Sequence, residues 1–212
     1  MKINKILLAL LFIHLSSLAQ DFSYFSRANI SVGNKTHRLA THVTQDINYT
    51  FGGGFGLEGG IESQMDPNLG LYCSLGYQQI MAYYNKSIKD VSSESSAFFN
   101  RKFITLGANL TIVKLDSLDE VSIDLGFSYH FPGELVVNQH FNEYNTSFDP
   151  SAGFHFGVKY RKPISDIISV ESGVRLRVLD FKEQASEKIY NSNGTELSIS
   201  LIYKFKKENT KI

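Results

Sequence analysis

The chain has 212 residues, and its 21 Lys and Arg balance 21 Asp and Glu, so the formal net charge is zero. This balance gives no support for nucleic-acid binding. Cys73 is the single cysteine, which excludes a disulfide framework within one chain, and the length with no Pro-rich or Gly/Ser-rich linker predicts one domain.

The N-terminus has the features of a secretory signal. Lys2 and Lys5 precede an apolar run over 6–15, and Ser17-Leu18-Ala19 fits a small-x-small cleavage site. The run is shorter than the ~20 residues that a membrane-spanning helix needs. We predict a removed signal over 1–19 and a mature domain over 20–212, with a buried N-terminal helix as the alternative. Cleavage removes two lysines, so 19 basic and 21 acidic residues remain, a formal charge of −2.

Eight later segments alternate apolar and polar residues. In the clearest, Val121 to Phe131, every second residue from Val121 is apolar and the residues between are polar or Gly, a period of two that a helix cannot produce. The predicted strands are Tyr24 to Gly33, Phe51 to Glu62, Leu69 to Tyr84, Phe98 to Val113, Val121 to Phe131, Ser151 to Arg161, Ile167 to Phe181 and Thr195 to Phe205.

The connections between these strands alternate in length. Short ones cover 64–68, 114–120 and 162–166, and long polar ones cover 34–50, 85–97, 132–150 and 183–194. Alternating strands with alternating connections predict an all-β fold, an eight-stranded antiparallel up-and-down transmembrane β-barrel with two unlike sides. The long loops are then the expected seat of binding to an extracellular ligand.

The polar faces of the strands are rich in charge and in glycine. A narrow barrel interior requires such charges to pair, and small residues must stand opposite long ones. The predicted lumen charge network consists of Arg27, Glu58, Glu62, Asp124, Lys159, Arg161, Glu171, Arg175 and Lys204. We expect mutual pairing to plug the lumen, and a narrow or gated pore is the alternative.

The whole pattern resembles the small eight-stranded outer-membrane barrels of OmpA-like and OmpX-like kind, and the outer-membrane β-barrel domain family of Bacteroidota. The resemblance implies a location in the outer membrane of a Gram-negative bacterium, with short turns and both termini in the periplasm. It also implies outer-membrane lipid and the barrel assembly machinery as partners. In that family the last strand carries an assembly signal, which Leu201, Tyr203 and Phe205 resemble; the departure is that Lys206 to Ile212 continues beyond it.

Residues that could carry chemistry are few. Ser128 and His130 share a predicted inward face with His155, but outer-membrane lipid A deacylases carry His before Ser, the reverse order. We therefore predict an interior polar pair and no enzyme. His37 and His42 are too few ligands for a metal site, and no cofactor is expected. The expected function is structural or surface-binding, and a lipid-modifying enzyme and a soluble lipocalin-like carrier remain less favoured alternatives.

Overall fold

The computed structural model describes residues 21–35, 37–39, 47–49, 51–88, 91–115, 119–139 and 142–205. The predicted signal over 1–19 lies outside these residues. Among them no helix is long and apolar enough to cross a membrane.

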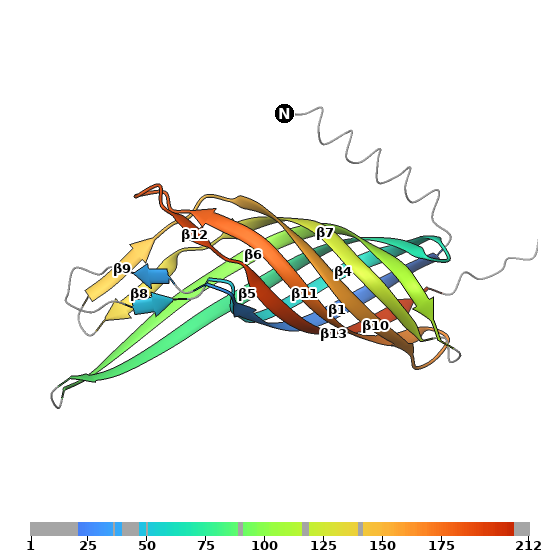
Figure 1. Ribbon diagram of the computed structural model, residues 1–212, viewed down its shortest axis with the longest axis horizontal. Coiled ribbons are helices and arrows are strands. Elements are labelled where there is room, and N and C mark those ends of the chain that lie inside the picture. The colour runs from blue at the N-terminus through green and yellow to red at the C-terminus, as the bar shows by residue number, and fades with distance from the viewer. Residues whose placement is uncertain are drawn as a thin grey trace, which may run out of the picture.

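The described chain forms a closed eight-stranded antiparallel barrel, which confirms the predicted fold class (Figure 1). Each barrel strand pairs with its neighbour in the chain, and the last strand pairs with the first to close the barrel. The barrel strands are β1 (Asp21–Gly33), β4 (Gly54–Asp66), β5 (Leu69–Ile88), β6 (Val91–Lys114), β7 (Glu120–Pro132), β10 (Ser151–Pro163), β11 (Ile168–Lys182) and β13 (Gly194–Lys204).

The strands are strongly staggered around the barrel. A path through directly opposed residues leaves β7 at Val121 and returns to β7 at Phe131, ten residues further on. The path passes through Tyr160, Ser172, Ile199, Ala28, Leu57, Tyr77 and Lys102. A stagger of this size over eight strands implies a strand tilt of about 40°.

The apolar faces point outward and the charged faces point inward. On β7, Leu125 and Phe127 are 49% and 56% exposed, whereas Asp124 between Ile123 and Leu125 is 0% exposed. The same alternation continues on β10, β11 and β13. A soluble carrier barrel requires the opposite arrangement, so the lipocalin-like alternative disagrees with the structure.

The apolar exterior has the height of a bilayer core. On β7 it runs from Val121 to Phe131, which at a tilt of about 40° corresponds to roughly 25 Å along the barrel axis. Aromatic rings mark its two ends: Tyr24 packs against Phe205 at 4.7 Å between ring centroids near one end, and Tyr129 packs against Phe131 at 5.1 Å near the other. Such girdles are typical of barrels that cross membranes.

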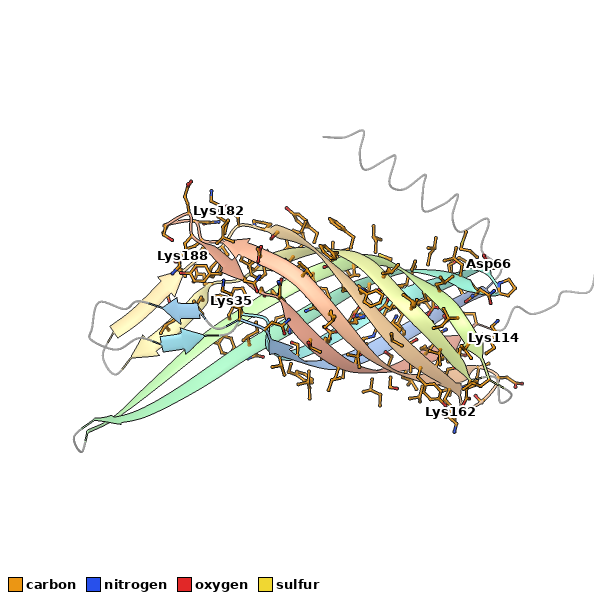
Figure 2. The ribbon with its side chains drawn as sticks, viewed as in Figure 1. Lys35, Asp66, Lys114, Lys162, Lys182 and Lys188 are labelled. Atoms are coloured by element: carbon orange, nitrogen blue, oxygen red, sulfur yellow. The ribbon has the colours of Figure 1, made fainter. Side chains whose placement is uncertain are left out.

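The two ends of the barrel differ. The end with the short connections, near Asp66, Lys114 and Lys162, is the short-turn end; the end near Lys35, Lys182 and Lys188 is the long-loop end (Figure 2). The start of β1 and the end of β13 both lie at the short-turn end, since Asp21 pairs opposite Gln64 and Ser23 opposite Lys204.

The predicted long loops contain further strands. β5 and β6 continue as a hairpin to Ile88 and Val91, through most of the segment expected to be a loop over 85–97. The shorter strands are β2 (His37–Leu39), β3 (Ile47–Tyr49), β8 (Leu135–Gln139), β9 (Asn142–Thr146) and β12 (Ile189–Asn191). The mostly polar composition of the long connections did not indicate these strands, which are short and pair with neighbouring strands through backbone hydrogen bonds.

An apolar cluster fills the barrel toward the long-loop end. Phe51 and Phe99 are 0% exposed and their rings meet edge to face at 5.5 Å. Phe148, from the third long connection, packs against both rings at 5.4 Å. The full cluster is Phe51, Ile80, Ala97, Phe99, Leu135, Val137, Phe148, Leu179, Phe181 and Tyr190. The interior is therefore apolar toward the long-loop end and charged in the middle of the barrel.

Candidate functional site in the barrel lumen

The first group of lumen charges follows the strand register. Arg27 lies directly opposite Glu58 across β1 and β4, and its Nη1 donates to Glu58 Oε2 at 2.9 Å. Arg161 lies opposite Glu171 across β10 and β11, with Nη2 2.8 Å from Oε2. Ser200 separates the two pairs and accepts a hydrogen bond from Arg27 Nε at 2.9 Å.

The second group depends on a glycine. Asp124, Gly157 and Arg175 are opposed in one row across β7, β10 and β11. A Cβ on Gly157 would lie 2.9 Å from Arg175 Cγ, so only glycine leaves Arg175 room to cross β10. Arg175 Nε reaches Asp124 Oδ2 at 2.5 Å, and its Nη1 reaches Glu58 Oε2 at 3.0 Å. Arg175 thus connects carboxylates from two sides of the barrel.

Tyr72 lies in the middle of the lumen. Its hydroxyl is 2.8 Å from Asp124 Oδ1 and 2.8 Å from His155 Nε2. Gly107 and Gly126 stand between Tyr72 and His155 in the same row, and a Cβ on either glycine would collide with the ring beside it. The inward glycines therefore make room for large polar side chains, as the sequence predicts.

Lys159 completes the central cluster. Its ammonium group is 3.2 Å from Asp124 Oδ1, donates to Asn109 Oδ1 at 2.8 Å and lies 4.8 Å from the centre of the Tyr72 ring. It is also 3.7 Å from Glu171 Oε1, which joins the two groups of charges. Desolvated charges require such partners, and here each acid named meets at least one cation.

Eight of the nine predicted network residues line the lumen. Glu62 joins them through Arg161, whose Nη2 lies 2.7 Å from Glu62 Oε2. Lys204 lies outside the network: its side chain is exposed at the end of β13, where it lines an open mouth of about 440 Å³ at the short-turn end. The alternation of β13 directs it inward, but the barrel already opens to solvent at this level.

Further lumen residues were not among the predicted set. Arg177 pairs with Glu196, and it donates through Nη1 to Gln78 Oε1 at 2.8 Å. Arg101, 0% exposed, donates to the same Gln78 oxygen at 2.9 Å and to Ser192 Oγ at 2.9 Å. The alternation of β11 and β13 could have predicted the inward positions of Arg177 and Glu196. Arg101 lies near the end of a predicted strand with less regular alternation, which gave no clear prediction for it.

Ser128 and His130, the residues considered for catalysis, are buried. Ser128 Oγ and His130 Nε2 are 2.8 Å apart, and the two residues are 2% and 0% exposed. Across the described ranges no group of three or more His, Cys, Asp or Glu could hold a metal ion. His37 lies in β2, and His42 lies outside the described residues.

The residues of the predicted assembly signal lie on the exterior. Leu201 and Tyr203 on β13 are 56% and 44% exposed, and Phe205, directly after β13, is 46% exposed. Residues 206–212 lie outside the described part of the chain.

The solved structures with a similar fold include outer-membrane and surface proteins. Neisserial surface protein A shares 14% identity at a TM-score of 0.54, over 87% of this chain and 97% of that one. A major outer membrane protein from Thermus thermophilus shares 14% sequence identity at a TM-score of 0.53, over 87% of this chain and 98% of that one. The outer membrane protein OprG from Pseudomonas aeruginosa shares 11% sequence identity at a TM-score of 0.50, over 89% of this chain and 97% of that one.

No protein-family model matches the chain. No curated protein matches it either. Membership of the Bacteroidota family therefore stays a prediction, and these structural likenesses concern the fold.

Proposed function

We propose that this chain is an integral outer-membrane β-barrel whose lumen is closed and whose long-loop end carries a structural or surface-binding role. The observation that carries the proposal is the inverted polarity of the barrel: an apolar exterior about 25 Å high encloses paired charges. The location of the similar structures in outer membranes supports the same assignment.

Closure of the lumen rests on two layers. Arg27, Arg175 and Lys159 occupy the middle of the barrel in pairs with carboxylates from several strands. Beyond them toward the long-loop end lies the apolar cluster around Phe51 and Phe99. An ion crossing this barrel would have to disrupt both layers, and eight strands leave room for little besides side chains.

Planar-bilayer recording tests closure. The full chain inserted into a bilayer is expected to give no reproducible single-channel conductance. Conductance that changes in Glu171→Gln or Arg175→Gln would contradict closure and support the alternative of a narrow or gated pore. Flotation with lipid vesicles, done on the same sample, tests membrane insertion separately.

A non-enzymatic role is part of the proposal. It is supported by the burial of Ser128 and His130 on the inward face of β7, away from the lipid-facing exterior. Mass spectra of lipid A from cells that lack or overproduce the protein are expected to be identical. A change in acyl chains that Ser128→Ala abolishes would establish a lipid-modifying enzyme.

The surface role is assigned to the long-loop end. There the β5–β6 hairpin, β8 and β9 form an extension of the sheet, because β8 pairs with β6 and β9 with β8. Replacement of 138–143 by a short Gly-Ser turn, which keeps the buried Leu135 and Val137, is expected to abolish adhesion of cells that display the protein while the barrel still inserts. Unchanged adhesion would remove this hairpin from the proposed binding surface.

A further inference from the structure

A shallow groove of about 630 Å³ crosses the exterior of the barrel over β4, β5 and β6. The groove exists because Gly59, on the outward face of β4, has no side chain to fill it. Gly59 lies directly opposite Ser26 on β1, and Leu75 and Ile104 continue the same row of opposed residues on β5 and β6. A Cβ built on Gly59 would find its nearest neighbour, the Phe25 carbonyl oxygen, at 3.8 Å. The space over Gly59 is therefore open in an otherwise bulky apolar wall.

Lys102 borders this groove and is exposed. It lies on the outward face of β6, directly opposite Tyr77 on one side and Phe131 on the other. Its ammonium group forms no ion pair or hydrogen bond with the described part of the chain. A cation between aromatic rings at the edge of an apolar wall is suited to an anion at the membrane surface.

The position of the groove along the barrel axis matches the outer half of a bilayer. Phe131 marks the upper end of the apolar exterior, and a strand tilt of about 40° places Lys102 roughly 3 Å below it. Gly59 lies two strands away from Lys102 and two residues nearer the short-turn end than Leu57 in the row of Lys102, which together place it about 11 Å below Lys102 along the barrel axis. Lys102 thus lies just inside the upper edge of the apolar exterior, from which its long side chain can extend to headgroup level, and the open groove reaches toward the bilayer centre.

We propose that the groove binds an anionic lipid of the outer leaflet, with its headgroup phosphate on Lys102 and one acyl chain over Gly59. This inference rests on the proposed membrane role. The groove supplies apolar contact along the chain, and the charge of Lys102 supplies selectivity for an anionic headgroup over a zwitterionic one.

Native mass spectrometry of the full chain tests the site, after reconstitution with equimolar phosphatidylglycerol and phosphatidylcholine. Wild type is expected to retain phosphatidylglycerol several-fold over phosphatidylcholine. Lys102→Gln is expected to abolish this preference, and Gly59→Leu to lower retention of both lipids several-fold. Lys162→Gln, an exposed cation at the short-turn end, and Ser172→Leu, an outward position on β11, serve as matched controls and are expected to behave as wild type.

The outcomes separate the site from the membrane role. Vesicle flotation of wild type comes first, and failure to insert would contradict the membrane role. Inserted protein without lipid preference, or with the same preference in Lys102→Gln, would overturn the lipid site. If the protein forms dimers without bound lipid and Gly59→Leu disrupts them, the groove binds a second copy of this chain and the lipid site is overturned. Excess inorganic phosphate is expected to leave lipid retention unchanged, and displacement by it would show an anion site without a lipid.

Discussion

Arg175 is the residue on which the lumen network depends most. It lies within 3.5 Å of three carboxylates, from Asp124, Glu58 and Glu196. Arg175→Gln leaves these buried charges undercompensated, and we expect a loss of about 3–5 kcal/mol in the free energy of unfolding. Urea unfolding in lipid vesicles measures it.

The exposed pair of Lys182 and Glu187, 3.2 Å apart, provides the control for Arg175. Lys182→Gln is expected to change the same free energy by less than about 1 kcal/mol. Equal effects of the two substitutions would mean that the lumen is hydrated enough to screen its charges.

Two glycines on opposite faces of the wall give a second prediction. An alanine Cβ at Gly107 would lie 2.5 Å from the Tyr72 hydroxyl oxygen, whereas at Gly59 its nearest neighbour is 3.8 Å away. Gly107→Ala is expected to destabilise the barrel by about 1–3 kcal/mol through overpacking. Gly59→Ala is expected to be neutral or slightly stabilising. Vesicle-based urea unfolding compares them, and a harmless Gly107→Ala would indicate a looser lumen around Tyr72.

Single residues differ in how far the sequence could predict their roles. Arg27 and Glu58 lie on strands with regular alternation, which predicts that both point inward. The pairing of β1 with β4 then places them directly opposite each other. Tyr72 was not predicted, because only charged residues were assigned to the lumen network. Gly107 and Gly126, whose missing side chains leave space beside its ring and beside His155, make room for it in the lumen. That complementarity spans three strands and is invisible along one segment.

Among whole elements, the barrel strands were predictable and the outer strands were not. The alternation from Val121 to Phe131 predicted β7 to within one residue at each end. Segments 85–97 and 132–150 read as loops because polar residues dominate them, yet β6 pairs with β5 and with β8 there. Alternation of apolar and polar residues indicates a strand whose two faces meet lipid and lumen, and these mostly polar segments lack such a pattern, although Leu135 and Val137 of β8 are buried in the apolar cluster.

The end of β13 gives a prediction about assembly. Phe205 packs against Tyr24 and Tyr203, with ring centroids 4.7 and 5.6 Å away. If it is part of the assembly signal, Phe205→Ala lowers the amount of folded barrel in the outer membrane several-fold. Phe127→Ala, which removes an exposed ring on β7, controls for the loss of an aromatic side chain. Electrophoresis without heating quantifies folded protein, and equal losses in both variants would argue against a signal at Phe205.

At the scale of the whole molecule, the stagger of the strands is consistent with the apolar exterior and the charged interior of the barrel. Ten residues of stagger tilt the strands by about 40°, and this tilt converts eleven-residue alternating segments into an apolar exterior of roughly 25 Å. The small number of strands keeps the interior narrow enough for Arg175 and Glu58, from strands that are not adjacent, to meet at 3.0 Å. The height of the apolar exterior therefore follows from the stagger, and the pairing across the lumen follows from the number of strands.

This geometry predicts how a charge on the exterior should depend on depth. Leu125 lies about 10 Å above the short-turn edge of the apolar exterior, near the expected bilayer midplane, whereas Val121 lies at that edge. Leu125→Arg is expected to cost about 2–4 kcal/mol of unfolding free energy in vesicles, and Val121→Arg about 0–1 kcal/mol. A protein with a water-exposed exterior would tolerate both equally. Equal costs for the two variants would therefore contradict a membrane-embedded wall, and a large cost confined to Leu125 would locate the midplane of the bilayer on β7.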